Sequence, residues 1–550
     1  MPTITFALKD LEKLVGKKLK LEQVEELAAY GKGDYEGYNE KTDEIKIDFG
    51  DTNLPYLWSI EGVARLFRRI LGLDKGIAKL DFKKSGYSVK VDSSVSKVRP
   101  YISAFIAKGK KIDDYLIKQL IQLQEKLCDN YGRKRQKVAI GIYSYKKIKF
   151  PVYYKAIDPE SISFTPLDFK REMTPGEILE SHPKGKEYAW ILEGFKKYPI
   201  LIDDNGEVLS FPPVINSNNT GRVDEGEEDL FFEATGLDSD SLNLATNIFA
   251  QAFFERGFKI ESVDINYPDK KITTPHMFNE TIKVDNSKIK SLLGLELKES
   301  DMKKLVEKAG YNYTNGKVSI PHYRKDILHQ VDVIEDIGIM YGYDNIDEKP
   351  LTSFTIGNSL PIVKLIDKAR DVMAGLGCQE IMSPILSSKE VLYNKMNLKD
   401  FGTVEIKAYM SESYSVVRTW LIPILMDCLS KNKHVEYPQK IFEQGLVTVK
   451  KGEWVIDYER LAYVSANEKA DYTEAKQALD YLLRMLNVQY EIEEVDHDTF
   501  IPGRVGRVIV DGKKVGFIGE IIPIVLDNCG LEMPAVAFEI NLTEIYKVIQ

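Results

Sequence analysis

The sequence predicts an α+β protein built from several domains, and three observations support this fold class. The chain has 550 residues, more than a single hydrophobic core accommodates, so we expect roughly three to five domains. Segments with apolar residues at helical spacing alternate with short strand-like segments along the chain. The composition, 43% hydrophobic and 29% charged, is that of an ordinary globular protein.

The first part of the chain, residues 1–85, is expected to form a small α+β module that ends in a helix. Apolar side chains repeat at helical spacing from Ile60 to Leu71. Ser59 directly precedes this pattern and belongs to a residue type that caps helix N-termini. We therefore expect a helix that begins after Ser59.

The rest of the chain is expected to form three further domains. Residues 86–268 contain short strands such as KVAIGIYSY and EVLSFPPVI, and helices such as DSLNLATNIFAQAFFERG. Residues 269–348 form a compact unit that ends in a helix, and residues 347–361 form a connector. The last domain, 359–550, opens with the helix PIVKLIDKARDVMAGLG and continues with alternating strands and helices.

Charge and cysteine content limit the classes of function. The net charge of −9 argues against wholesale coating of nucleic acid, although local basic patches remain compatible with it. The four cysteines are widely separated and include no C-x-x-C pair, so neither zinc nor a disulfide framework is expected. No apolar stretch approaches about 18 residues, and the N-terminus lacks the apolar core of a signal peptide. We expect a cytoplasmic protein that does not bind membranes.

Acidic residues cluster in the segment RKDILHQVDVIEDIGIMYGYDNI, residues 324–346. Spacings of three and four place acidic side chains on one helix face, with Asp326 a little ahead of them. The acids at these spacings are Asp332, Glu335 and Asp336, and the apolar residues on another face are Val331, Ile334, Gly338 and Tyr341. From spacing alone, the acids form either the solvated face of an amphipathic helix or a cation site.

Six segments, in fixed order, resemble one family. They are TNLPYLWSIEGVARLFRRILG (52–72), SIPHYRKDILHQVDVIEDIGIMYGYDNI (319–346), YSVVRTWLIPILMDCLSKN (414–432), PQKIFEQGLV (438–447), FIPGRVGRVIVDGKKVGFIGEI (500–521) and PAVAFEINL (534–542). Together they resemble the β subunit of phenylalanyl-tRNA synthetase. The chain length and the segments SHPKGKEYAWIL and LSFPPVIN resemble the archaeal and eukaryotic type.

This resemblance implies an architecture and a function. Residues 86–268 would be a B3/B4-type editing domain, residues 269–348 a winged-helix-like B5 domain, and residues 359–550 a degenerate class II synthetase domain with an antiparallel sheet. The chain would pair with an α subunit in an (αβ)₂ heterotetramer that charges tRNA(Phe). The α subunit would bind ATP, L-phenylalanine and Mg²⁺.

The C-terminal domain departs from a working class II synthetase. ATP binding in that class needs arginines on the motif-2 strand and the motif-3 helix. The corresponding strand here contains Glu443 without an adjacent arginine, and the terminal segment offers Glu539 without the expected arginine. Arginines occur instead at Arg418, Arg504 and Arg507. We expect no catalytic residues for aminoacylation in this chain, and packing against a partner is favoured over hidden catalysis.

The resemblance also implies an editing site. An apolar pocket rejects the added hydroxyl of tyrosine by only about 10²-fold, so mischarged Tyr-tRNA(Phe) has to be hydrolysed at a second site. The residues that fit this site are Leu201, Ser210, Glu233 and Thr235, as a wall, two hydroxyls and an acceptor for the tyrosine hydroxyl. Alternatively, Ser210 and Thr235 are ordinary strand-end residues and Glu233 is a surface acid.

Several positions near this predicted site depart from relatives. Glu233 stands where archaeal relatives commonly carry aspartate, and Cys128, Tyr143 and Ser144 stand where relatives tend to carry histidine or a His-Asp pair, so the state of editing stays open. One basic patch, consisting of His182, Lys184 and Lys186, is positioned to meet the tRNA 3′ end. The run GRKRQKV, residues 132–138, is either part of an RNA surface or a solvated charge run.

With the B5 resemblance, the acidic cluster gains a specific interpretation. Asp326, Asp332, Glu335 and Asp336 match the acids that bind a Mg²⁺ shared with the α subunit, and Mg²⁺ prefers such hard oxygen ligands. We therefore favour a structural metal over a solvated face. Two other classes of function remain: a free-standing deacylase for mischarged tRNA, and a non-catalytic assembly factor that binds nucleic acid through the winged-helix-like unit.

Overall fold

The computed structural model describes residues 2–51 and 53–549. Three residues lie outside this description: Met1 and Gln550, at the ends of the first and last predicted domains, and Thr52, in the first segment that resembles the family. The chain divides into two compact units, Met1–Pro350 and Leu351–Gln550. Residues 347–360, within the predicted connector, are exposed and contain neither helix nor strand. Each unit is described separately below.

The first unit begins with a small antiparallel sheet in the strand order β1-β3-β2. Its strands and helices are β1 (Thr3–Ala7), α1 (Leu8–Val15), α2 (Leu21–Ala29), β2 (Gly33–Asn39), β3 (Glu44–Phe49) and α3 (Ile60–Ile70). The side chain of Ser59 accepts a hydrogen bond from the backbone N–H of Gly62 at 3.2 Å and so caps α3. The predicted helix and its start are confirmed.

A large mixed sheet follows in the order β10-β9-β8-β7-β4-β12-β5-β11-β6, with β13 paired to β12. Its strands are β4 (Phe82–Val91), β5 (Tyr101–Lys108), β6 (Val138–Ser144), β7 (Val152–Ile157), β8 (Tyr198–Ile202), β9 (Val208–Phe211), β10 (Ile215–Asn216), β11 (Leu230–Gly236), β12 (Lys259–Asn266) and β13 (Lys271–Thr274). Its helices are α4 (Asp114–Lys126), α5 (Pro175–Ser181), α6 (Pro183–Tyr188) and α7 (Ser239–Glu255). The predicted boundary at residues 85/86 falls within β4, and the one at 268/269 separates the paired strands β12 and β13.

The last part of the first unit combines a small antiparallel sheet, in the order β14-β16-β15, with three helices. The elements are β14 (Thr281–Lys283), α8 (Asn286–Leu293), α9 (Glu299–Lys308), β15 (Asn312–Thr314), β16 (Lys317–Ser319) and α10 (Gln330–Tyr341). The helix α10 buries Val333, Ile334, Ile337, Gly338 and Met340. Val331, which we assigned to the apolar face, is 44% exposed, so that assignment is wrong at this position.

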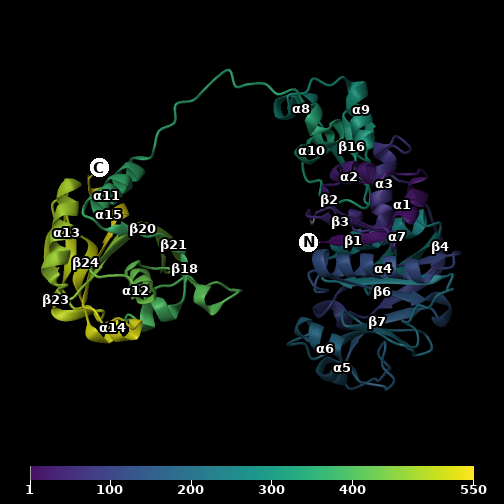
Figure 1. Cartoon of the computed structure of the whole chain (residues 1–550). Helices are drawn as coiled ribbons and strands as arrows, with labels where there is room; N and C mark the ends of the chain where they lie inside the picture. The colour runs from purple at the N-terminus through teal and green to yellow at the C-terminus, as the bar shows by residue number, and fades with distance from the viewer. Residues whose placement is uncertain (1, 52, 550) are drawn as a thin grey trace. The chain divides into compact units, whose positions relative to one another are not determined.

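The N-terminal module and the large sheet share one hydrophobic core. Phe67 of α3, Phe105 of β5 and Phe253 of α7 belong to a single buried cluster, which also contains Tyr323 and Met340. Helix α7 covers the sheet on the side of the N-terminal module, and α4 covers the sheet beside it (Figure 1). This continuous core fixes the N-terminal module against the sheet and against α10.

The second unit contains a sheet in the order β17-β20-β21-β25-β24-β23-β22, antiparallel except for the pair β17–β20. Its strands are β17 (Gln379–Glu380), β20 (Gln439–Lys451), β21 (Trp454–Ala466), β22 (Glu491–Glu494), β23 (Phe500–Val510), β24 (Lys513–Ile521) and β25 (Ala535–Asn541), and β18 (Leu386–Ser387) pairs separately with β19 (Val416–Val417). Its helices are α11 (Pro361–Gly375), α12 (Ile422–Lys431), α13 (Tyr472–Met485), α14 (Pro523–Cys529) and α15 (Leu542–Ile549).

Two separate cores cover the two faces of this sheet. Helices α11, α13 and α15 pack on one face, and α12 and α14 pack on the other (Figure 1). The predicted α+β class, with an antiparallel sheet in the C-terminal part, is confirmed. Within residues 2–51 and 53–549, no helix is both long enough and apolar enough to cross a membrane.

Candidate functional sites

A cavity of about 680 Å³ opens beside the large sheet of the first unit, and we call it the sheet cavity. Three of the four residues predicted for editing line it: Ser210 at the end of β9, and Glu233 and Thr235 on β11. Helix α4 supplies much of the apolar wall, and the segment around His182 closes another side. The fold thus brings together residues that lie far apart in the sequence.

Leu201, the fourth predicted residue, is placed differently. It lies on β8 directly opposite Ser210, but its side chain is fully buried in a hydrophobic cluster with Tyr154 and Phe231. It does not contact the sheet cavity in the described structure. Leu201 therefore belongs to the core beneath the site, and its predicted role as a pocket wall is corrected.

Glu233 is buried in the middle of the sheet. Its side chain is 3% exposed, because β11 lies between β5 and β6 and is covered on both faces. The hydroxyl of Tyr143 donates a hydrogen bond to Oε1 of Glu233 at 2.7 Å, whereas Oε2 has no partner among the described residues. Burial raises the pKa of Glu233 to about 7. The alternative that Glu233 is a surface acid is wrong.

Thr235 is held by an arginine that the sequence analysis did not identify. Arg99, 1% exposed, donates from Nε to the Thr235 hydroxyl at 2.9 Å and from Nη2 to the Thr235 carbonyl at 2.6 Å. Burial lowers the pKa of Arg99. No local pattern marks Arg99, because Thr235 lies 136 residues further along the chain and its other acceptors, the carbonyls of Arg135 and Gln136, lie 36 and 37 residues away. The hydroxyl of Thr235 therefore accepts from Arg99 and lies at the cavity wall with its own O–H as the remaining donor.

Two more polar atoms near the cavity lack partners in ordinary hydrogen-bond geometry. Oγ of Ser210 and Nε2 of His182 are buried, with Ser210 close to the Tyr143 hydroxyl and the His182 ring close to the Leu167 backbone, and neither atom makes a hydrogen bond of normal geometry within the described residues. Nδ1 of His182 accepts from the backbone N–H of Lys184 at 3.1 Å, and burial lowers the pKa of His182. Buried polar atoms without partners are rare and call for a ligand or ordered water. Together with Oε2 of Glu233, these atoms equip the sheet cavity for a polar ligand.

The basic and cysteine positions divide between the cavity and the surface. Cys128 lines the cavity, and burial raises the pKa of its thiol to about 12, so it remains protonated. In the run 132–138, Arg135 lines the cavity and donates to the carbonyl of Val214 at 2.9 Å, whereas Arg133 and Lys134 are exposed. In the predicted basic patch, Lys184 lines the cavity and Lys186 does not. Ser144, one of the positions that depart from relatives, has a buried side chain.

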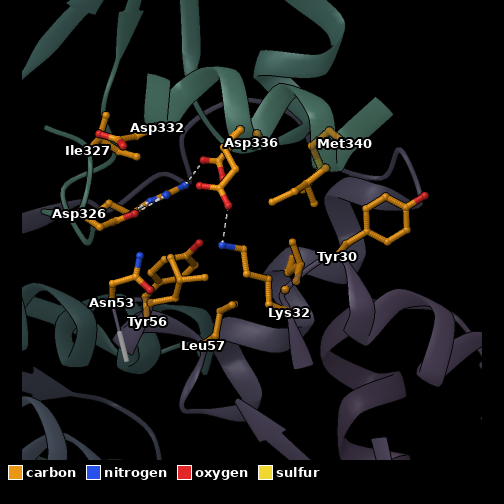
Figure 2. Close-up of a pocket in the computed structure, with 17 residues that line it drawn as sticks. Tyr30, Lys32, Asn53, Tyr56, Leu57, Asp326, Ile327, Asp332, Asp336 and Met340 are labelled. Atoms are coloured by element: carbon orange, nitrogen blue, oxygen red, sulfur yellow. Dashed lines mark hydrogen bonds and ion pairs between the residues drawn. The ribbon is translucent and has the colours of Figure 1, made fainter. Parts of the chain in front are cut away.

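The four predicted metal ligands line a separate cavity of about 50 Å³ between the N-terminal module and α10 (Figure 2). Figure 2 shows Lys32 of the N-terminal module pointing toward the acids of α10. We call this set the acid cluster: Asp326, Asp332, Glu335 and Asp336, with Lys32 and Arg324. The fold therefore brings all four predicted acids to one place.

Cations and backbone groups of the same chain already contact each acid. Arg324 forms a two-pronged pair with Asp326, and its Nη1 contacts Asp336 at 2.6 Å. Tyr311 also donates to Asp336. Lys32 pairs with Oε1 of Glu335 at 2.8 Å and also with Asp51 at 2.9 Å. The pair with Glu335 links the N-terminal module to α10.

Asp332 differs from the other acids because it contacts the backbone. Its Oδ2 accepts from the N–H groups of Leu328 and His329 and so caps the start of α10. Among the described residues, no group of three or more acidic, histidine or cysteine side chains is arranged as a metal site. One oxygen of each acid on α10 still lacks a donor from the described residues: Oδ1 of Asp332, Oε2 of Glu335 and Oδ1 of Asp336. The four carboxylates of the acid cluster, together with Asp51 on Lys32, outnumber the two cations Lys32 and Arg324, so the formal local charge is negative.

In the second unit, charged residues at the expected synthetase positions satisfy one another. Arg418 pairs with Glu443 at 2.6 Å, and their side chains are 3% and 1% exposed. Glu539 accepts from the backbone N–H groups of Leu421 and Ile422, at the start of α12, and pairs with Arg460 at 2.8 Å. Glu443 and Glu539 are thus engaged by donors of the protein itself. Neither carboxylate is therefore free to bind a ligand cation or a metal ion.

Comparison with known proteins now defines the class. Residues 282–343 match the family described as tRNA synthetase B5 domain, and residues 347–542 match the Phenylalanyl tRNA synthetase beta chain CLM domain. Both models describe parts of aminoacyl-tRNA synthetases, and the relatives below extend this class to the whole chain.

Full-length relatives define the family. The chain is 43% identical to the phenylalanine–tRNA ligase β subunit of Pyrococcus furiosus and 39% identical to that of Archaeoglobus fulgidus, with 99–100% of each sequence covered. A crystal structure of an N-terminal fragment of the Pyrococcus horikoshii phenylalanyl-tRNA synthetase β subunit matches 62% of this chain and all of that fragment, with 41% identity and a TM-score of 0.60. The chain belongs to the family of phenylalanine–tRNA ligase β subunits.

Proposed function

We propose that the chain supports ATP-dependent attachment of L-phenylalanine to tRNA(Phe) as the β subunit of an (αβ)₂ enzyme. The reaction is ATP + L-phenylalanine + tRNA(Phe) → AMP + pyrophosphate + Phe-tRNA(Phe), with the α subunit supplying the ATP chemistry. The observation that carries this proposal is the full-length similarity to β subunits. The internal pairing of Glu443 with Arg418 and of Glu539 with Arg460 supports the absence of ATP chemistry here.

Size measurement of the chain expressed with and without an α subunit tests the assembly. We expect a stable complex of two α and two β chains, located in the cytoplasm. A chain that stays free in the presence of α contradicts the proposal and favours a free-standing deacylase or an assembly factor. Deacylation of mischarged tRNA by the free chain, measured in parallel, separates these last two alternatives.

The sheet cavity is proposed to bind the aminoacyl end of mischarged Tyr-tRNA(Phe) for hydrolysis. Its support is the set of buried polar atoms without partners at Glu233, Ser210 and His182. A tyrosine hydroxyl donating to Oε2 of Glu233 satisfies a buried acceptor that a phenylalanine ring leaves unpaired. A hydrogen bond to a charged group contributes roughly 1.5–3 kcal/mol, which corresponds to about ten- to a hundredfold discrimination. Because the pKa of Glu233 is about 7, this full contribution is reached only as the pH rises above 7.

Substitution of Glu233 tests the editing proposal in the assembled enzyme. Glu233→Ala is expected to increase accumulation of Tyr-tRNA(Phe) about ten- to a hundredfold while Phe charging stays unchanged. Glu180→Ala, at an exposed acid, serves as the control. Hydrolysis of Tyr-tRNA(Phe) by Glu233→Ala at the wild-type rate contradicts the proposed role.

The acid cluster is proposed to hold Mg²⁺ that ties α10 to the α subunit. Of the four predicted ligands, Asp332, Glu335 and Asp336 would hold it directly or through water. Asp326, the fourth, is left out of the proposed ligand set because both of its oxygens accept from Arg324. The support is the residual negative charge and the three carboxylate oxygens without donors. Mg²⁺ usually keeps several waters, so oxygens on one helix face suit it. When bound, the ion would neutralise charge and join two subunits.

A further inference from the structure

The second unit contains a cavity of about 320 Å³ that none of the sites above uses. It lies on the sheet face that carries α12, across four neighbouring strands. Arg460 of β21, Glu539 of β25, Phe517 of β24 and Arg507 of β23 all contribute to its wall. Phe517 lies opposite both Arg507 and Glu539 in the strand register. We call it the arginine cavity.

Its cationic groups are incompletely satisfied. Within the part of the chain that the structure describes, Arg507 forms no hydrogen bond or ion pair, and its Nε is buried. Its guanidinium lies 3.7 Å from the ring centroid of Phe517, which holds the planar group in place. Nε of Arg460 is also buried without a partner, and the exposed Lys514 lies at the rim. These unpaired N–H donors favour an anionic ligand.

The single acid that lines the described cavity is unavailable to a ligand. Glu539 pairs with Arg460 through Oε1, and its Oε2 accepts two backbone N–H groups at the start of α12. A ligand ammonium group would therefore find no carboxylate in the cavity. This charge arrangement excludes a zwitterionic amino acid as the preferred ligand and favours an anion without an amine.

Aromatic rings form the remaining wall. Trp420, His497, Phe500 and Phe517 line the cavity, and the ring of His497 lies 4.5 Å from that of Phe517 and 5.1 Å from that of Phe500. Burial and the nearby Arg507 lower the pKa of His497 to about 4, so this ring is neutral at pH 7. These rings meet edge-on or tilted, at interplanar angles of 67° for His497 and Phe517 and 59° for His497 and Phe500. A wall of aromatic side chains suits a planar group, because flat faces bury apolar area with little loss of conformational freedom.

We propose that the arginine cavity binds a small organic anion attached to a planar ring and lacking an ammonium group. A nucleoside monophosphate and an aryl carboxylate share this chemistry, and a cavity of about 320 Å³ lies at the lower end of the range for ligand pockets, roughly 300–1,000 Å³. The anion contacts Arg507 and Arg460 while the ring stacks among the aromatic side chains. We expect binding without catalysis, because the described lining includes no serine, threonine or cysteine and its one acid, Glu539, is already paired.

Calorimetry on the full-length chain without the α subunit tests this site. The probes are AMP and phenylpyruvate, with inorganic phosphate and L-phenylalanine as comparisons. We expect AMP, phenylpyruvate or both to bind with a dissociation constant below about 1 mM. AMP alone identifies the nucleotide class, and phenylpyruvate alone identifies the aryl carboxylate class. Either result requires that phosphate and L-phenylalanine bind more weakly.

Three variants connect binding to the cavity. Arg507→Met keeps the contact with Phe517 and removes the charge, so affinity should fall about ten- to a hundredfold. Lys514→Gln changes an exposed side chain that does not support the fold and should weaken binding severalfold. Arg504→Gln is the matched control. Arg504 lies on β23, as Arg507 does, but it pairs with Glu520 and does not line the cavity. This variant should bind like the wild type.

Several results overturn the proposal. Binding of neither AMP nor phenylpyruvate contradicts it directly. Equal affinity for inorganic phosphate would show a site for a simple anion, without a role for the planar ring. Equal affinity for L-phenylalanine would show that the lack of an unpaired carboxylate in the cavity does not exclude ligands with an ammonium group. Affinities unchanged in both Arg507→Met and Lys514→Gln place the ligand elsewhere. If Arg507→Met does not fold, Lys514→Gln against Arg504→Gln decides alone.

Discussion

Replacing Glu233 by glutamine is expected to change how the stability of the first unit depends on pH. The pKa of this buried carboxyl is raised from 4.5 to about 7 in the folded chain, mainly by burial. A pKa difference of about 2.5 units corresponds to about 3 kcal/mol. Because the folded-state pKa is the higher one, folding favours the protonated form. The stabilising contribution is complete below pH 4.5 and is lost as the pH rises through 7.

The assay compares urea unfolding of the wild-type chain and Glu233→Gln at pH 4.5 and pH 8. Both proteins carry the same residues 351–550, so the difference between their unfolding free energies reports the first unit. We expect the wild type to lose about 3 kcal/mol relative to Glu233→Gln between these two pH values. Tyr143→Phe removes the hydroxyl that donates to Glu233 and should shift the wild-type transition to higher pH.

Parallel pH profiles for the wild type and Glu233→Gln would refute this reasoning. They would mean that water or a rearrangement of β11 solvates the carboxylate, and that Oε2 is not held as a buried acceptor. The proposed recognition of a tyrosine hydroxyl would then lose its electrostatic basis.

Three further predictions concern ion pairs. Glu335→Gln should lower Mg²⁺ content and weaken Mg²⁺-dependent assembly with the α subunit; unchanged metal content and affinity would return the acids to a solvated face. Lys32→Met should increase Mg²⁺ affinity, measured by metal titration, because it removes a competing cation from Glu335; weaker affinity contradicts the proposed site. Glu443→Gln should destabilise the second unit by about 3–5 kcal/mol in urea unfolding, because it leaves Arg418 buried without its partner; a change below about 1 kcal/mol contradicts this.

Local patterns in the sequence were sufficient to predict individual helices. Helical spacing of apolar residues and the Ser59 cap predicted α3, α11 lies within its predicted segment, and α7 begins one residue before its predicted segment. The pattern was insufficient on α10, where Val331 is apolar but exposed. An apolar residue next to a buried face satisfies the same spacing rule, and only packing against neighbours shows which residues are covered.

Contacts between distant segments were outside the reach of local patterns. Strand β4 pairs in parallel with β12, so the boundary placed at residues 85/86 cut a strand whose partner lies far along the chain. Arg99 and Tyr143 contact Thr235 and Glu233 through the same non-sequential strand order. The candidate site residues came from family resemblance. Their partners became visible once the strand order was known.

Asp332 shows why a predicted ligand needs structural context. Its Oδ2 caps α10, so Asp332→Asn removes helix stability of about 0.5–2 kcal/mol together with any metal contact. Glu335 carries no such role and is the cleaner position for testing Mg²⁺. Spacing placed both acids on one face, but it contained no information about which oxygen the backbone already uses.

The central claim is that this chain works with a separate α subunit and lacks ATP chemistry of its own. Phenylalanine-dependent pyrophosphate exchange tests it most directly, measured on the purified chain alone and after reconstitution with an α subunit. Because the arginines expected on the motif-2 strand and the motif-3 helix are missing, the chain alone should show no exchange, and reconstitution should restore both exchange and charging of tRNA(Phe). Exchange by the chain free of α, or no activity after a complex has formed, would contradict the account.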